Sequence, residues 1–276
     1  MPINGSGKRL TSVAPQFATG RAPTRPMQDA PTNPACRPAR LVPIHIPDDA
    51  SLIDPDSGGP GAHPHPHPHP PEYAGHLAGV LLPSARIGSR AAELASLIHE
   101  DYAGRRPHLV CVLKGASIFF HEMLRRLQDR SQGYTFDFLR ASSYEGTETT
   151  GTVRVSEDFD YGGLEGRDVI VVEDIIDTGV TLSRLLPVLR ERGGCRSVEV
   201  CTLLEKRIDG ERGARAAEAG GGGGHAPVVA RYCGFSIPNR FVIGYGLDYN
   251  ELYRDLRDIW IISQAGIEFD HKTLAV

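Results

Sequence analysis

The segment 168–182, which reads DVIVVEDIIDTGVTL, limits the possible folds of this chain more than any other segment. It contains four consecutive β-branched residues at 169–172 and continues into an acidic pair, Glu173 and Asp174. An unbroken β-branched run is typical of a strand that is buried on both faces of a parallel sheet. Because open α/β sheets bind ligands at the carboxyl ends of their strands, we expect the acidic pair to lie at a ligand site.

The residues after this strand favour phosphate binding. Asp177, Thr178, Gly179 and Thr181 supply small, hydroxylated or Cβ-free positions, and a helical pattern follows them. In such a turn, successive backbone N–H groups can converge on a phosphate at the helix N-terminus. An anion site beside two carboxylates predicts a sugar phosphate and a divalent cation. The alternative is a generic buried strand followed by a solvated acidic turn. Three carboxylates at this spacing, combined with an Asp-Thr-Gly-x-Thr turn, are uncommon in such a segment.

The hydrophobic periodicity of the preceding segment predicts helices that alternate with strands. We expect a helix that Ser84 caps and Gly104 ends, because apolar residues between them recur at helical spacing. A buried strand at 108–113, a tight turn at Lys114-Gly115 and a helix at 118–127 follow.

The rest of the folded segment continues this alternation. We expect a mobile flap between two antiparallel strands at 136–142 and 153–156, because the residues between them are polar and rich in glycine. Pro187 should kink or shift the helix that we expect at 181–192. Further strands are expected at 197–204, 241–245 and 258–262. This order predicts an α/β fold with a parallel sheet flanked by helices.

Composition separates the N-terminal segment from the rest. Residues 1–39 are rich in Pro, Ser, Thr and Arg and have few large apolar side chains, so we expect them to be disordered. They carry four basic residues before the first acidic one, Asp29, which leaves organellar import open, although the prolines argue against an amphipathic helix. The chain has neither an apolar run long enough to span a membrane nor a secretory signal, so we expect a cytoplasmic protein.

Two low-complexity stretches interrupt the folded segment. The stretch 57–71 alternates His and Pro near its end, and 209–226 contains five consecutive glycines. We interpret both as inserts without a function of their own, although the histidines could bind a soft divalent metal weakly.

Cysteine spacing and charge exclude several classes of function. The five cysteines show no CxxC spacing, so reduced thiols are expected rather than a zinc site or disulfides. A net charge of −4 without a long basic patch gives no support to nucleic-acid binding.

The segment 168–182 resembles the phosphoribosyl pyrophosphate signature of the type I phosphoribosyltransferases. Together with Leu113-Lys114-Gly115, Ser143-Tyr144, Lys206, the run FVIGYGLDYNE at 241–251 and Arg254-Asp255, it resembles the hypoxanthine-guanine phosphoribosyltransferases. The resemblance implies a transferase domain at 40–276 that contains both inserts. It also implies the type I fold, with a small hood formed by N- and C-terminal segments, which would begin near 41–49.

This resemblance implies purine salvage. Such enzymes transfer the 5-phosphoribosyl group from phosphoribosyl pyrophosphate to N9 of hypoxanthine or guanine, which yields IMP or GMP and pyrophosphate. It implies Mg²⁺ as cofactor, with Glu173 and Asp174 at the ribose and metal and Asp248 at a second metal. Asp177 corresponds to the general base that takes the purine N7 proton.

The resemblance also assigns the binding residues. Lys114, Gly115 and Arg254 correspond to pyrophosphate contacts, with a nonproline cis bond before Lys114, and the residues of the 5′-phosphate loop are Thr178, Gly179, Val180 and Thr181. Relatives often have lysine in place of Val180, so we expect weaker phosphate attraction here. The purine contacts are Lys206, Phe241, Val242 and Asp248, and the flap residues are Ser143 and Tyr144.

Several alternatives remain open from the sequence. The enzyme could prefer xanthine, or the chain could be an inactive regulator with the transferase fold. Arg254 could instead form a surface ion pair with Asp255 or Asp258. The resemblance favours a homodimer or homotetramer, although no interface is evident in the sequence.

Overall fold

The computed structural model describes residues 42–53, 69–142, 154–156, 158–208 and 228–270. These belong to one compact unit, Pro38–Val276. The segment 1–39, most of the insert 57–71, the whole insert 209–226 and the flap residues Ser143 and Tyr144 lie outside the described residues. Within the described ranges, no helix is long and apolar enough to cross a membrane.

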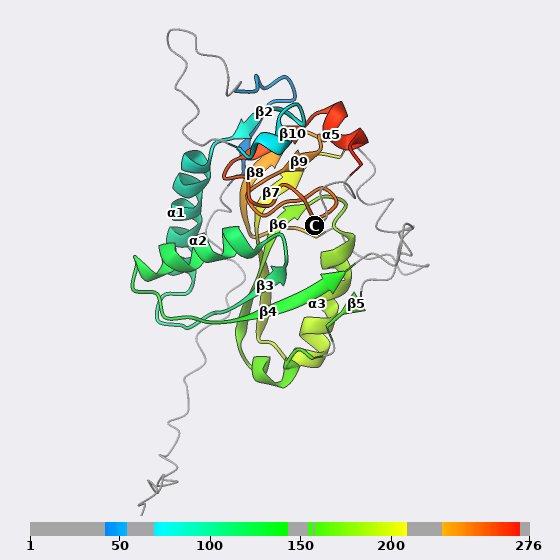
Figure 1. Ribbon diagram of the computed structural model, residues 1–276. Coiled ribbons are helices and arrows are strands. Elements are labelled where there is room, and N and C mark those ends of the chain that lie inside the picture. The colour runs from blue at the N-terminus through cyan, green and yellow to red at the C-terminus, as the bar shows by residue number, and fades with distance from the viewer. Residues whose placement is uncertain (1–41, 54–68, 143–153, 157, 209–227, 271–276) are drawn as a thin grey trace, which may run out of the picture. The chain divides into compact units, whose positions relative to one another are not determined.

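A seven-stranded sheet forms the centre of this unit (Figure 1). Six of its strands, in the order β1-β8-β7-β6-β3-β4, run parallel, and β5 pairs antiparallel with the end of β4. The strand bounds are β1 Ile44–His45, β3 His108–Leu113, β4 Thr135–Ser142, β5 Arg154–Val155, β6 Asp168–Ile176, β7 Ser197–Lys206 and β8 Tyr232–Ile237. The predicted parallel α/β sheet is therefore confirmed, with β6 in its interior.

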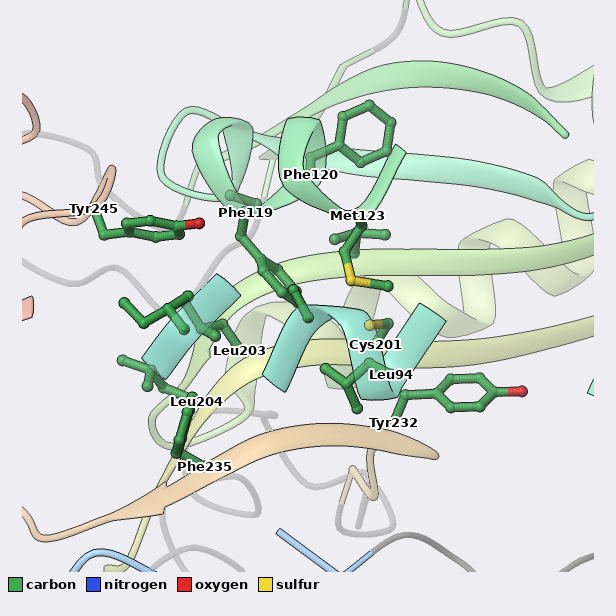
Figure 2. Close-up of a cluster of buried hydrophobic side chains, with 14 of the residues drawn as sticks. Leu94, Phe119, Phe120, Met123, Cys201, Leu203, Leu204, Tyr232, Phe235 and Tyr245 are labelled. Carbon is green, nitrogen blue, oxygen red and sulfur yellow. The ribbon is translucent and has the colours of Figure 1, made fainter. Parts of the chain in front are cut away.

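Helices cover both faces of the sheet, and β6 contacts both layers. Ile170 and Val172 face a core shared with α1 (Ser84–Asp101) and α2 (Ser117–Gln128), whereas Val169 and Val171 face α3 (Val180–Gly193). All four side chains are fully buried, which explains why no polar residue interrupts the run. Figure 2 shows the α1 and α2 side of this core, where Leu94, Phe119 and Met123 cluster with Cys201 and Leu203.

A second, three-stranded antiparallel sheet lies outside the parallel one. Its order is β2 (Leu77–Leu82), β10 (Ile259–Ile262) and β9 (Val242–Ile243). The expectation that 241–245 and 258–262 extend the parallel sheet was wrong. These short strands pair with β2 instead, and Val80, Ile243 and Trp260 bury their side chains in a separate apolar cluster.

Other differences concern strand membership and the start of α1. Among the described residues 42–53, β1 pairs with β8 of the parallel sheet, and Ile53 forms an isolated bridge to Val80 of β2. Pro83, rather than Ser84, is the N-cap of α1, and the backbone N–H of Ser84 donates to Asp258 Oδ1 at 2.6 Å. Three short helices complete the described elements: η1 Pro71–Tyr73, η2 Tyr161–Leu164 and α5 Gln264–Glu268.

Candidate active site

The acidic pair lies at the carboxyl end of β6, where the sequence placed it. Asp174 is buried, and Glu173 Oε2 is buried without a hydrogen-bond partner among the described residues. Burial and the neighbouring Asp174 charge raise the pKa of Glu173 well above its usual value. Burial also raises the pKa of Asp174, although the backbone N–H of Ile175 donates to its Oδ1 at 2.7 Å. Both carboxylates are removed from water, and one of their oxygens has no hydrogen-bond partner, so a bound cation would stabilise their negative charge.

The turn after β3 lies directly against Asp174. A Cβ added at Gly115 would be 1.7 Å from Asp174 Oδ2, so only glycine permits this approach. The Leu113–Lys114 peptide bond before it is cis. A Cβ added at Gly246 would in turn be 2.2 Å from the Gly115 carbonyl oxygen. Segments from three distant parts of the sequence therefore meet at the carboxyl edge of β6.

Four charged side chains form a network beside this contact. Lys114 Nζ lies 2.8 Å from Glu251 Oε2, and Arg254 Nη2 lies 2.8 Å from Asp248 Oδ1 and 3.4 Å from Glu251 Oε2. Arg254 Nη1 also donates to the Gly246 carbonyl at 2.9 Å, and its buried Nε has no partner among the described residues. The hydrogen bond from Lys114, followed by the charge of Arg254, lowers the pKa of Glu251.

Arg254 does not form the surface ion pair with Asp255 or Asp258 that was the alternative to a binding role. Asp255 accepts a hydrogen bond from the Tyr73 hydroxyl at 3.1 Å, and Asp258 accepts one from the start of α1. Sequence reasoning gave Glu251 no role. Its position within the 241–251 run was the only signal in the sequence. Its contact with Lys114 spans 137 residues and depends on the tertiary fold, so no local pattern could indicate it.

A second group lies where β6 and β7 end. Lys206, at the end of β7, is buried, and its Nζ lies 2.9 Å from Asp177 Oδ2. The same Nζ lies 5.5 Å from the ring centroid of Phe241, whose side chain is 48% exposed. Tyr249 meets the Phe241 ring edge-to-face at a centroid distance of 5.2 Å. The structure thus brings together the proposed base, the lysine and an aromatic ring with a free face.

The loop between these residues and α3 has the expected backbone. Gly179 has a φ of +78° and is the N-cap of α3, which begins at Val180. Val180 and Thr181 in the first turn of α3 are partly exposed, as is Thr178, which precedes Gly179. Orphan N–H groups of a helix N-terminus attract anions, and Gly179 provides the left-handed turn that precedes it.

The remaining predicted residues are less closely assembled. Val242 is buried in β9 and paired with Ile261 of β10, so only its main chain could meet a ligand. Across the described part of the chain, no three His, Cys, Asp or Glu side chains converge where a metal ion could be held. Glu173 and Asp174 therefore do not form one closed ligand set with Asp248.

Comparisons with known proteins agree with this geometry. A family model described as a phosphoribosyl transferase domain matches residues 80–216. The hypoxanthine-guanine phosphoribosyltransferase of Mycobacterium tuberculosis is 41% identical over 191 residues, which cover 67% of this chain and 85% of the relative. The enzyme of that name from Homo sapiens is 36% identical over 200 residues, covering 70% and 85%.

Two further proteins extend the comparison. The hypoxanthine-guanine-xanthine phosphoribosyltransferase of Tritrichomonas foetus is 39% identical over 186 residues, covering 67% of this chain and 92% of the relative. A crystal structure of a hypoxanthine phosphoribosyltransferase from Staphylococcus aureus superposes with a TM-score of 0.59 at 33% identity, covering 72% of this chain and 98% of the other.

Proposed function

This chain belongs to the hypoxanthine-guanine phosphoribosyltransferase family, and we propose that its site salvages purines with phosphoribosyl pyrophosphate. In the reaction, the bond from the ribose anomeric carbon to pyrophosphate breaks, and a bond from that carbon to purine N9 forms. The purine loses a proton, and IMP or GMP leaves with pyrophosphate. Each step requires a different group at the carboxyl edge of the sheet.

The observation that carries the proposal is the meeting of Asp177, Lys206 and Phe241. A buried lysine ammonium can donate to the 6-oxo group of hypoxanthine or guanine but not to the 6-amino group of adenine. The half-exposed Phe241 ring offers a surface on which a purine can stack, and Tyr249 supports that ring. Asp177 lies within reach of the same ligand and, as a carboxylate, can accept the purine proton.

The other group of residues suits the leaving group. Lys114 and Arg254 supply two positive charges beside Gly115, and the buried Arg254 Nε has no partner among the described residues. Gly115 allows its backbone to approach closely both Asp174 and the ligand. The first turn of α3 would hold the 5′-phosphate with backbone donors at 178–181, since Val180 contributes no charge.

Magnesium fits the acidic pair, because Glu173 Oε2 is buried without a partner next to a second carboxylate. Mg²⁺ prefers oxygen ligands and usually keeps several waters, so it does not require three protein ligands at one point. Glu173 and Asp174 would contact the ribose and metal-bound water, and Asp248 would serve a second ion. A bound ion would neutralise the pyrophosphate as it leaves.

We also propose the wider organisation of the protein. Residues 40–276 form the transferase domain, in agreement with the compact unit Pro38–Val276, and residues 1–39 are an extension. Tyr144 and Ser143 would close over the reacting ribose and exclude water.

We propose a cytoplasmic homodimer or homotetramer, and the exposed rings of Phe136 and Phe138 on β4 offer an apolar surface for self-association. Light scattering of the purified chain would measure the assembly.

A substitution of Lys206 tests the purine assignment. We expect Lys206→Met to raise the KM for hypoxanthine by about 10- to 100-fold, because a hydrogen bond to a charged group contributes roughly 1.5–3 kcal/mol. The KM for phosphoribosyl pyrophosphate should change little. If both KM values rise equally, Lys206 supports the fold of the site and does not read the purine. Conversion of xanthine in preference to hypoxanthine by the wild-type enzyme would favour the second substrate assignment.

A further inference from the structure

Glu251 connects two cations that come from different parts of the chain. Its Oε2 lies 2.8 Å from Lys114 Nζ, in the turn after β3, and 3.4 Å from Arg254 Nη2. The side chain of Glu251 is 65% exposed and that of Lys114 is 59% exposed, so a ligand from solvent can reach both. No other described carboxylate lies within ion-pair distance of Lys114.

The loop backbone holds this carboxylate in place. The N–H of Glu251 donates to Asp248 Oδ2 at 2.8 Å. Asn250 and Glu251 have φ values of +51° and +68°, in the left-handed region that non-glycine residues seldom adopt. Asn tolerates this region, but Glu seldom adopts it, so the free enzyme keeps the Glu251 carboxylate between two cations although the backbone conformation of Glu251 is unfavourable.

These two cations are the ones that the proposed function assigns to pyrophosphate, and the present inference rests on that function. We propose that Glu251 is a positioning residue that occupies the place of the pyrophosphate anion between Lys114 and Arg254 in the free enzyme. Arriving pyrophosphate, free or as part of phosphoribosyl pyrophosphate, replaces the Glu251 carboxylate at both cations. When the product leaves, the carboxylate returns.

This exchange determines whether Glu251 strengthens or weakens pyrophosphate binding. Pyrophosphate must break two existing ion pairs before it can form its own, so Glu251 weakens pyrophosphate binding and helps its release. Glu251→Gln keeps the shape of the side chain but removes its charge. Exposed ion pairs contribute up to about 1 kcal/mol, so the variant should bind pyrophosphate roughly two- to fivefold more tightly.

Calorimetric titration with inorganic pyrophosphate and magnesium tests this directly. The full-length wild-type chain, Glu251→Gln and the control Asp255→Asn would be compared at one ionic strength. Asp255 belongs to the same loop, but its carboxylate meets the Tyr73 hydroxyl rather than Lys114. We expect a lower Kd for Glu251→Gln alone, with a lower KM for phosphoribosyl pyrophosphate and an unchanged KM for hypoxanthine.

The outcomes separate this inference from the proposed function. A merely structural Glu251 would leave binding unchanged or weaken it on substitution, and either result would overturn the inference. An equal gain in pyrophosphate affinity in Asp255→Asn would also overturn it, because removal of any negative charge from the loop would then explain the gain. If the wild-type chain neither binds pyrophosphate nor converts hypoxanthine, the proposed function itself fails.

Discussion

Replacement of Gly115 by alanine should inactivate the enzyme through a displacement of Asp174. The new Cβ would be 1.7 Å from Asp174 Oδ2 and 2.8 Å from its Cγ. Since real Cβ contacts are almost never shorter than 3.0 Å, the carboxylate or the turn must move by about 1.3 Å. A misplacement of about 1 Å at reacting groups can reduce the rate about 100-fold.

Steady-state kinetics would measure this effect. We expect kcat/KM for phosphoribosyl pyrophosphate to fall about 100-fold in Gly115→Ala, and overpacking to lower the free energy of unfolding by roughly 1–3 kcal/mol. Gly88→Ala is the matched control, because its Cβ would lie 3.4 Å from the nearest atom, Arg126 Nη2, in the middle of α1. Wild-type kcat/KM in Gly115→Ala would refute the close packing of this turn on Asp174.

Three further predictions concern proton transfer, acid stability and the N-terminal extension. Asp177→Asn should lower kcat by about 10²- to 10⁴-fold with little change in the KM for phosphoribosyl pyrophosphate, because it removes only the proton acceptor; an equal loss in both parameters would indicate a binding role. Burial alone would raise the pKa of Asp168, but hydrogen bonds from Arg196 and Ser197 and the charge of Arg105 leave that pKa below its usual value. Asp168→Asn should therefore lower the free energy of unfolding by about 2–3 kcal/mol at pH 7. In urea titrations this difference should begin to shrink below about pH 4, where the carboxylate of the unfolded chain is protonated, and it should be lost as pH falls further through the lowered pKa of the folded state; a difference that is constant with pH would contradict the ionic role. A chain without residues 1–39 should keep the wild-type kcat, and an inactive but folded deletion variant would show that this extension takes part in catalysis.

Local patterns in the sequence were sufficient for the central βα units. The β-branched run at 169–172 required burial on both faces, and β6 lies in the interior of the sheet with helices on either side. Helix α3 covers Val180–Gly193 and so lies within one residue of the expected 181–192 at each end, and Gly194, with a φ of +55°, is its C-cap. Pro187 nevertheless lies inside α3.

Contacts between distant segments could not be predicted from local patterns. Strand β2 was missed because its apolar residues pair with β10, which lies about 180 residues later, and no local periodicity indicates that partner. Strand β8 was also missed, and it pairs with β7 and with β1, which lies about 190 residues earlier. The start of α1 depended on the Asp258 carboxylate rather than on Ser84, and this contact spans 174 residues.

The site shows the same division between local and distant information. The order of residues from Glu173 to Thr181 predicted an acidic pair near the end of a buried strand and a glycine turn before a helix, and β6, Gly179 and α3 have this arrangement. The proton-accepting role of Asp177 and the phosphate-binding role of 178–181 stay predictions. The sequence could not show that Lys206 pairs with Asp177, or that Glu251 lies between Lys114 and Arg254, because each contact depends on how separate loops meet at the sheet edge.

The most direct test of the central claim is a spectrophotometric assay of the purified full-length chain with each purine, phosphoribosyl pyrophosphate and magnesium. We predict that hypoxanthine and guanine are converted to IMP and GMP, with pyrophosphate released in equal amount, and that adenine is not converted. No conversion of any 6-oxopurine by the folded protein would contradict the assignment of Lys206, Phe241 and Asp177 to a purine site.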